Sequence, residues 1–99
     1  MTDDVRYGAF TWSAEKDKAN IRRHGLSFQD AAEAFADPRR IIARDDAHSK
    51  DEERLFCIGL MINRVVTVRF TLRGKTVRIF GAGFWRKGRK LYEKNNLHR

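Results

Sequence analysis

The stretch Arg64–Phe80 constrains the fold more than any other part of the chain, because apolar and polar residues alternate along it. A period of two residues is typical of a β-strand that has one buried face. Gly74 and Lys75 interrupt the alternation and fit the two-residue loop of a β-hairpin with glycine in its first position. The stretch therefore predicts two antiparallel strands joined by a tight turn.

Both arms of this hairpin place their apolar residues on one face, as a correct register requires. The two-residue loop sets Thr71 opposite Arg78 and Arg69 opposite Phe80. The apolar face carries Val66, Val68, Phe70, Leu72, Val77 and Ile79. The other face is basic and carries Thr67, Arg69, Thr71, Arg73, Thr76 and Arg78. We therefore expect three arginines to project from the same side of the sheet.

The basic residues are concentrated in the second half of the chain. Residues 1–50 contain nine Lys or Arg and nine Asp or Glu, whereas residues 51–99 contain twelve and four. The second half therefore carries the whole formal net charge of +8. A strong excess of one sign of charge favours a partner of the opposite sign, here a polyanion.

Length and composition predict one domain over residues 1–99. Cys57 is the single cysteine, so an intrachain disulfide is excluded and a buried free thiol in a reducing compartment is expected. The apolar run Phe56–Ile62 is far shorter than the roughly 20 residues of a membrane span. The acidic start Met1–Asp4 lacks the residue order of a signal peptide. We expect a cytoplasmic protein that makes no membrane contact.

The first quarter of the chain predicts a short strand followed by a helix. The strand covers Ala9–Trp12, and Ser13 is a suitable N-cap for a helix through about His24. Gly25 can end this helix because glycine adopts the left-handed conformation at low cost. The apolar stripe of the helix is thin, which predicts a position on the surface.

A second helix is predicted after Ser27, which can form a capping box with Asp30. Asp37 and Pro38 end the helix. Its apolar residues recur at the spacing of one helix face and are Phe28, Ala31, Ala32 and Phe35. We expect this face to pack on the apolar side of the hairpin.

The remaining segments complete an α+β fold. Strands are expected at Ile41–Arg44 and Leu55–Leu60, joined by the polar loop Asp45–Glu53. Gly81–Gly83 is expected to be a flexible break before a basic helix over Phe84–Asn95. The order β-α-α-β-β-β-β-α describes a small antiparallel sheet with the two N-terminal helices on one face and a basic C-terminal helix.

Several fixed spacings in the chain resemble a known family. Residues 10–38 read F-T-W-S-A-E-K-x3-N-x3-H-G-L-S-F-x2-A-x3-F-x-D-P. The run H-S-x2-E-x-R at His48–Arg54, the following Gly59 and the closing R-I-F-G-A-G…Y-E extend the likeness to about residue 93. This pattern is similar to the BrnT-type toxins of bacterial type II toxin–antitoxin modules, and the first block is its most specific part.

The resemblance implies a RelE-like fold and a metal-independent endoribonuclease that inhibits growth and needs no cofactor. It also implies neutralisation by a BrnA-type antitoxin that carries a ribbon-helix-helix domain. Operator DNA would then be contacted only through the toxin–antitoxin complex. RNA, the antitoxin and, indirectly, operator DNA are the partners that the resemblance implies.

The chain departs from this family after the last predicted strand. Relatives often have Ser-Ala-Arg there, with a glutamate in the basic helix, whereas this chain has Gly81 and Gly83 as the first and third residues. No glutamate precedes Tyr92 in the predicted helix. If the missing arginine contacts phosphate in relatives, its role would pass to Arg78 or Arg86.

Metal-free RNA cleavage requires a deprotonated 2′-hydroxyl, a cation near the pentacoordinate phosphate and a proton for the leaving 5′-oxygen. Arg69, Arg73 and Arg78 could present guanidinium groups to adjacent phosphate oxygens. Arg69 and Arg78 are the catalytic candidates among them. An ordinary solvated strand face is the alternative interpretation.

His48 is the leading candidate for the general base, because the usual pKa of histidine lies near neutrality. Glu52 or Asp46 could orient its ring or raise its pKa, and Glu52 is itself a catalytic candidate. A loop histidine bonded to backbone is the alternative. His24 is expected to bind helix-end carbonyls, and His98 is assigned no role.

Tyr92 could stack on a base or donate a proton, and packing against the sheet is the alternative. Trp85 is interpreted as a packing anchor rather than a platform for a base. Five further side chains are candidate phosphate contacts or parts of a merely solvated helix face, and they are Lys16, Arg86, Lys87, Arg89 and Lys90.

Other kinds of site are not indicated. One cysteine and three scattered histidines do not form a zinc-binding set, and no P-loop or dinucleotide-binding motif is present. We therefore expect neither metal nor cofactor. Two alternatives to catalysis remain open: a nucleic-acid-binding or antitoxin-docking module, or a basic face that mainly receives an acidic antitoxin segment.

Overall fold

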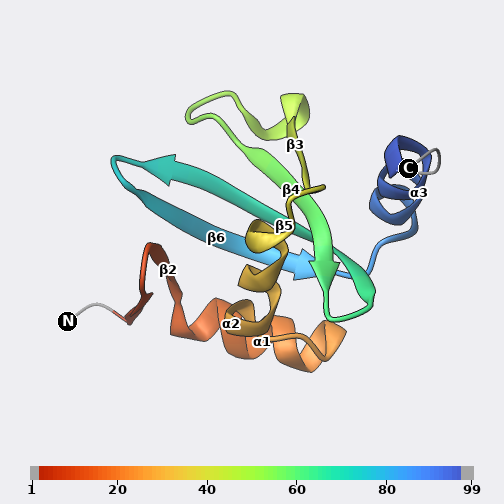
Figure 1. Cartoon of the computed structure of the whole chain (residues 1–99). Coiled ribbons are helices and arrows are strands. Elements are labelled where there is room, and N and C mark those ends of the chain that lie inside the picture. The colour runs from red at the N-terminus through yellow and green to blue at the C-terminus, as the bar shows by residue number, and fades with distance from the viewer. Residues whose placement is uncertain (1–2, 97–99) are drawn as a thin grey trace.

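A six-stranded sheet organises the structure, a computed structural model that describes residues 3–96 (Figure 1). The strands lie in the order β1-β2-β6-β5-β4-β3. They are β1 (Asp4–Tyr7), β2 (Phe10–Ser13), β3 (Ile41–Arg44), β4 (Leu55–Met61), β5 (Arg64–Arg73) and β6 (Thr76–Gly83). The predicted α+β class is confirmed, and Met1, Thr2 and His98 lie outside the described residues.

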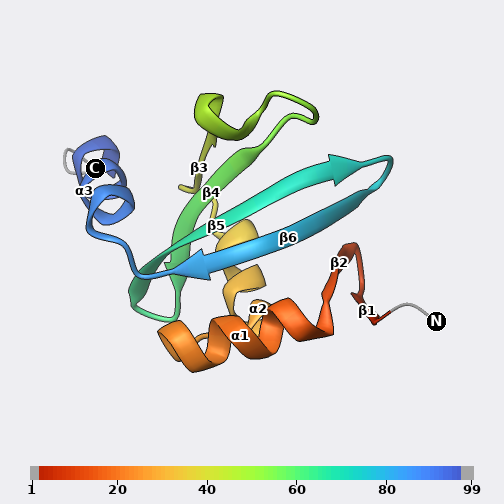
Figure 2. The same ribbon diagram turned by 180° about the vertical axis from the view of Figure 1, so that it is seen from behind.

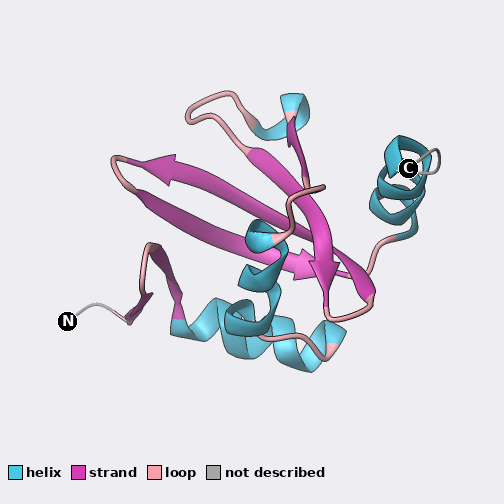
Figure 3. Cartoon of the chain, viewed as in Figure 1, coloured by secondary structure: helices cyan, strands magenta, loops and turns pink. Residues whose placement is uncertain are grey.

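The helical elements lie on both sides of this sheet (Figures 1 and 3). They are the α-helices α1 (Ala14–His24), α2 (Phe28–Ala31) and α3 (Arg86–Asn96), and the 3₁₀ helices η1 (Ala32–Ala36) and η2 (Asp46–His48). The predicted second helix therefore changes from α to 3₁₀ geometry after its first turn and ends before Asp37. No helix within residues 3–96 is long and apolar enough to cross a membrane.

The central hairpin forms as predicted for most of its length. Gly74 has a φ of 62°, the left-handed value that the first position of its loop requires. Thr71 lies opposite Arg78, as expected. The prediction that Arg69 faces Phe80 is wrong, because β6 contains a β-bulge and Gly81 lies opposite Arg69.

The residues after the bulge belong to the sheet. The expected flexible break at Gly81–Gly83 is the buried end of β6, paired with β5. Gly81, Ala82 and Gly83 show no alternation of polar and apolar residues. Small residues are needed here because the side chains of Arg69 and Trp85 lie close to the strand backbone. A break in the hydrophobic pattern was therefore mistaken for a break in the strand.

The amino-terminal part adds two strands rather than one. β1 pairs antiparallel with β2, and β2 pairs parallel with β6, so the sheet is mixed and not wholly antiparallel as expected. The parallel pairing sets Thr11 opposite Arg78 and Trp12 opposite Ile79. β1 was missed because the alternation in Asp-Val-Arg-Tyr covers only four residues, three of which are exposed.

The core lies between the sheet and the layer formed by α2 and η1, and α1 runs beside this layer (Figure 1). Both predicted helix starts are confirmed, since the hydroxyl oxygens of Ser13 and Ser27 accept the N–H groups of Lys16 and Asp30 at 3.2 and 3.1 Å. The most deeply buried large side chains include Phe28, Ile79, Val66 and Val68. Leu72 was expected on the buried face but is 58% exposed, because the hairpin tip extends beyond the helical layer (Figure 2).

Asn20 joins α1 to the free edge of β6. Its amide nitrogen donates to the carbonyls of Ala82 and Leu26 at 3.0 and 2.9 Å. Its amide oxygen accepts the N–H of Ala82 at 3.2 Å. The side chain therefore pairs with the strand as another strand would, and it holds α1 along the edge of the sheet.

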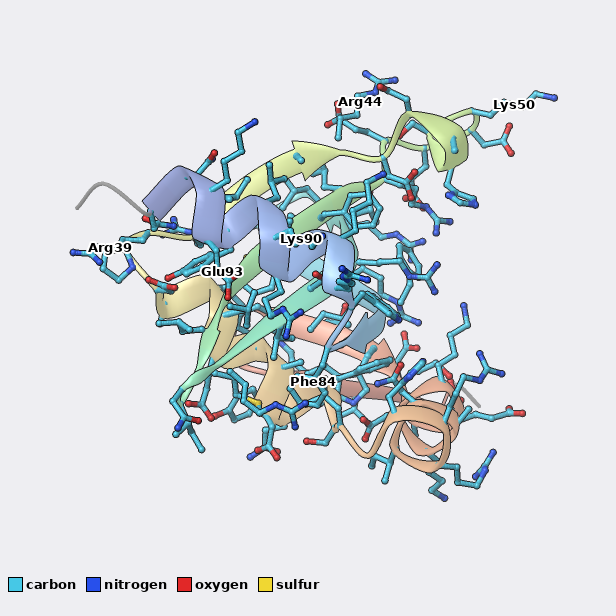
Figure 4. The ribbon with its side chains drawn as sticks, turned by 90° about the vertical axis from the view of Figure 1, so that its right-hand side faces the viewer. Arg39, Arg44, Lys50, Phe84, Lys90 and Glu93 are labelled. Carbon is cyan, nitrogen blue, oxygen red and sulfur yellow. The ribbon has the colours of Figure 1, made fainter. Side chains whose placement is uncertain are left out.

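Two glycines allow helices to touch strands closely. A Cβ on Gly59 of β4 would lie 2.5 Å from the carbonyl oxygen of Ala34 in η1. A Cβ on Gly88 of α3 would lie 2.0 Å from the hydroxyl of Thr67 in β5. Figure 4 looks onto α3, with Lys90 and Glu93 labelled on this helix. Gly88, whose effect on helix propensity is unfavourable, thus permits α3 to pack on the face of the sheet opposite α2 and η1.

Asp37 connects η1, β4 and α3. Its carboxylate accepts a hydrogen bond from the phenolic O–H of Tyr92 at 2.5 Å. It also accepts hydrogen bonds from the backbone N–H groups of Leu60 and Arg39, both at 2.9 Å. Burial opposes ionisation of Asp37, but these hydrogen bonds outweigh it, so its pKa lies below the usual value. Burial and the bond to Asp37 raise the pKa of Tyr92 to about 12.

We expect Tyr92→Phe to lower the free energy of unfolding by about 1.5–3 kcal/mol at pH 7, the range for a hydrogen bond to a charged group. The pKa of Asp37 falls below 3.8 on folding, so the carboxylate contributes its full stabilisation above that pH and loses it as the pH falls through the folded-state pKa. The difference in free energy of unfolding between the parent and Tyr92→Phe should therefore be smaller at low pH. Urea unfolding at pH 7 and pH 3 measures this, with Tyr7→Phe at an exposed site as control. A deficit that is equal at both pH values contradicts the assignment.

Candidate nucleic-acid interface

A cleft of about 590 Å³ lies between α1, the loop after β3 and the β5–β6 hairpin. Four of its lining residues are cations: Lys16, Arg23, Arg54 and Arg69. The lining also contains two histidines, His24 and His48. Asp45 is the one carboxylate in the lining. Phe70, Phe80 and Trp85 supply aromatic surface. The cleft therefore combines positive charge with aromatic surface, to which the exposed Trp85 contributes more than the buried Phe70.

Helix periodicity brings the α1 residues into the cleft. Lys16, Asn20 and Arg23 recur at intervals of four and three and therefore share one face of the helix. Asn20 holds this face against β6, as described above. Lys16 was predicted as a phosphate contact, whereas Arg23 was missed. The same spacing in the sequence could have identified Arg23.

The bulge in β6 shapes the floor of the cleft. Phe80 is the additional residue, because it lies between the Phe70–Ile79 pair and the Arg69–Gly81 pair without a partner of its own on β5. A Cβ on Gly81 would lie 2.8 Å from Nη2 and 3.0 Å from Nε of Arg69. The guanidinium of Arg69 thus lies across the bare backbone of Gly81, where a side chain would displace it.

Phe80 gathers cations around its ring. The Cζ atom of Arg54 lies 3.8 Å from the ring centroid, and Nζ of Lys16 lies 5.3 Å from it. Both distances fall within the range of a cation–π interaction. Within residues 3–96, Nε of Arg54 is one of the buried side-chain nitrogen or oxygen atoms without a hydrogen-bond partner. The ring therefore holds the Arg54 guanidinium in place, with the Glu52 carboxylate 3.5 Å from its Nη2.

His48 is paired with Asp45. Its Nδ1 lies 2.9 Å from Oδ2 of Asp45, whose side chain is 10% exposed against 67% for His48. A carboxylate can only accept, so in the neutral imidazole Nδ1 carries the hydrogen and Nε2 is the acceptor. The hydroxyl of Ser49 donates to the carbonyl of Asp45 at 2.6 Å and accepts the N–H of Arg54 at 2.9 Å, which fixes the loop.

The expected partners of His48 are replaced by Asp45. Asp46 instead lies 3.1 Å from Arg44, and Glu52 contacts Arg73 and Arg54. The reason is local, because the single turn of η2 brings residues three apart together. Asp45 was missed because its position at the start of this turn was not foreseen.

Glu52 is part of an ion-pair network beside the cleft. Its carboxylate accepts from Nε and Nη2 of Arg73 at 3.2 and 3.3 Å and lies 3.5 Å from Arg54. The hydrogen bond from Arg73 lowers the pKa of Glu52 and raises that of Arg73. Glu52 does not line the cleft; it holds two of the arginines that surround it.

The three hairpin arginines share a face but not a site. Arg69 lines the cleft, whereas Arg73 is bound by Glu52 and Arg78 lies 2.9 Å from Asp4 of β1. The ion pair of Arg78 depends on β1, the strand that the sequence did not reveal. The shared face was predicted correctly, and convergence of all three arginines on one pocket does not occur.

The remaining predicted site residues belong to α3. Tyr92 is buried and bonded to Asp37, so it does not line the cleft. Lys87 lines a second, apolar hollow of about 290 Å³ beneath α3. The three other basic residues predicted on α3 are exposed and outside the cleft, and they are Arg86, Arg89 and Lys90. Within residues 3–96, no group of three or more His, Cys, Asp or Glu residues could hold a metal ion.

Comparison with known proteins gives one family. The model of a family described as the ribonuclease toxin BrnT of type II toxin–antitoxin systems matches residues 12–88, which include all twelve lining residues of the cleft. No curated protein matches the chain significantly.

We expect Gly81→Ala to push the Arg69 guanidinium out of the cleft and to slow RNA cleavage about 10-fold, while the melting temperature stays close to that of the parent. The new methyl meets the flexible end of a side chain, so the strand can keep its path. Initial rates with a fluorescent RNA and a thermal melt measure both effects. Adding Gly81→Ala to Arg69→Ala should cause little further loss, and a fully additive loss contradicts the positioning role.

Proposed function

Because the chain belongs to the BrnT family of ribonuclease toxins of type II toxin–antitoxin systems, we propose that it is an endoribonuclease that cleaves RNA in this cleft without a metal ion. The observation that carries the proposal is the shared lining of the cleft by the Asp45–His48 pair and by Arg54 and Arg69. A base and fixed cations are the two requirements of metal-free phosphodiester cleavage.

His48 acts as the general base. Its Nε2 takes the proton of the 2′-hydroxyl while the 2′-oxygen attacks phosphorus and the bond from phosphorus to the 5′-oxygen breaks. Asp45 keeps the reactive lone pair on Nε2 and stabilises the imidazolium that forms. The leaving 5′-oxygen takes up a proton from solvent in the open cleft. The products are a 2′,3′-cyclic phosphate and a 5′-hydroxyl.

Arg69 and Arg54 stabilise the charge that develops on the phosphate. Each guanidinium presents several N–H donors to oxygen atoms, which a single ammonium group does not. Their positions are fixed before substrate binds, by the bare backbone of Gly81 and by the ring of Phe80. Lys16 and Arg23 contact neighbouring phosphates from α1, and Glu52 acts as a positioning residue for Arg54.

We expect cleavage of RNA to persist in EDTA, to fall at least 10²-fold in His48→Ala, as loss of a general base predicts, and to fall by a similar factor in Arg69→Ala. Gel analysis of labelled RNA measures the rates, and an end-group assay tests for the cyclic phosphate. Arg22→Ala is the matched control, because Arg22 is exposed on α1 and lies outside the cleft.

Three outcomes would contradict this mechanism. Cleavage abolished by EDTA would show that a metal takes part. Unchanged cleavage in His48→Ala would remove the assigned base. Salt-sensitive RNA binding without cleavage would instead identify a nucleic-acid-binding module.

The toxin–antitoxin family implies an antitoxin, and we propose a BrnA-type protein with a ribbon-helix-helix domain whose acidic segment covers the cleft. The proposal places both proteins in the cytoplasm, with operator DNA bound only through their complex. Four cations against one carboxylate in the cleft lining support an acidic occupant.

We expect the antitoxin to displace fluorescent RNA from the toxin in an anisotropy titration, because both occupy the same cations. Arg23→Glu should weaken antitoxin and RNA together, whereas Arg22→Glu should change both much less. Simultaneous binding of RNA and antitoxin would contradict the shared site. Binding of operator DNA by the toxin alone would contradict the indirect contact.

A further inference from the structure

Trp85 forms a wall of the basic cleft just before α3 begins. Its side chain lines the cleft on one side and the apolar hollow beneath α3 on the other. The residue is 36% exposed, in contrast to Trp12, which is 3% exposed in the core. A tryptophan that only anchored α3 would not need to line the cleft.

The indole is held in place by two neighbours. A Cβ on Gly83 would lie 2.6 Å from Cε2 and 2.8 Å from Cζ2 of Trp85, so the ring rests against the bare end of β6. The imidazole of His24 meets the ring edge to face, with centroids 5.5 Å apart and planes at 82°. Because the ring is already immobilised, a ligand that stacks on it loses less conformational entropy on binding.

The surroundings of this ring match the chemistry of a nucleotide. Arg69, Arg23 and Lys16 line the same cleft and can bind phosphate, while the indole offers a flat apolar surface to a base. Aromatic rings beside a positively charged groove are the usual means of binding a single strand with little dependence on sequence. Phe80 is less suitable as a platform because the guanidinium of Arg54 already lies over its ring.

We propose that Trp85 is the platform on which a nucleobase stacks beside the phosphate that is cleaved, and that Gly83 positions it. This inference rests on the proposed function of the cleft. It assigns a base subsite, separate from the phosphate subsite of Arg69, and gives Gly83 a role parallel to that of Gly81. His24 supports the ring from the side.

A pair of non-cleavable oligonucleotides tests the platform. One is a 2′-O-methyl uridine hexamer, and the other is a hexamer of the same backbone without bases. When the uridine hexamer binds, the parent protein should lose part of its tryptophan fluorescence. The buried Trp12 provides a constant background. Trp85→Ala should bind the uridine hexamer roughly 5- to 150-fold more weakly, the range for loss of one stacked base, and the abasic hexamer with unchanged affinity.

Two further variants separate stacking from folding. Trp85→Phe should recover most of the affinity for the uridine hexamer, because it keeps an aromatic ring. Gly83→Ala should weaken binding of that hexamer in the parent but not in the Trp85→Ala background. Equal loss of affinity for both hexamers in Trp85→Ala, or no loss for either, would overturn the proposal.

Arg69→Ala distinguishes the platform from the proposed function. It should weaken both hexamers, because both keep their phosphates. If Arg69→Ala changes neither affinity while Trp85→Ala weakens only the uridine hexamer, the platform stands and the phosphate subsite fails. If the parent binds neither hexamer, the proposed function of the cleft fails and the platform with it.

Discussion

The backbone of β6 needs hydrogen-bond partners along its outer edge, and the structure supplies them in two different ways. The first part of the strand pairs with β2, from Val77 to Ile79. β2 ends there, and further along the strand the side chain of Asn20 pairs with both backbone groups of Ala82. Unpaired buried backbone groups are costly, so this substitution is a condition of the fold. It also fixes α1 beside the sheet and thereby creates one side of the cleft.

Small residues then decide how closely the other parts approach. Gly59 and Gly88 bring helical elements against strands, whereas Gly81 and Gly83 bring the side chains of Arg69 and Trp85 against a strand. The two uses have the same physical basis, the absence of a Cβ. In β6 they place a guanidinium and an indole side by side on the cleft lining, with little freedom to move. This part of the cleft lining thus rests on bare backbone, whereas Arg54 rests on the ring of Phe80.

Positive charge is concentrated in the cleft and is partly offset by neighbouring groups. Four cations share the lining, which raises the potential there and attracts a polyanion. Among the described residues Asp45 forms no ion pair with these four cations, and its carboxylate is bonded to His48. Glu52 and the ring of Phe80 reduce repulsion among the neighbouring arginines. The ring of Phe80 thus allows Arg54 and Lys16 to lie near each other while both keep their charge.

Periodicity in the sequence was sufficient to predict the fold class, the central hairpin, the helix caps and the basic face of the hairpin. It failed at the bulge, because one additional residue leaves no mark on an alternating pattern until the partner strand is known. The contacts of Arg78 and His48 could not be predicted, since Asp4 lies in an unrecognised strand and Asp45 meets His48 only after η2 turns. The sequence shows Arg23 at helical spacing from Lys16 and Trp85 before the last helix. Their place in the cleft lining could not be predicted, because the cleft exists only in the folded chain.

The Asn20 amide has a consequence for the chemical ageing of the protein. It donates to two carbonyl oxygens and accepts one N–H, a combination that no other side chain of that size except a primary amide can provide. Deamidation to aspartate would turn the donor into a third oxygen facing two carbonyl oxygens. The loss of both donated hydrogen bonds and the added negative charge would therefore weaken the contact between α1 and β6.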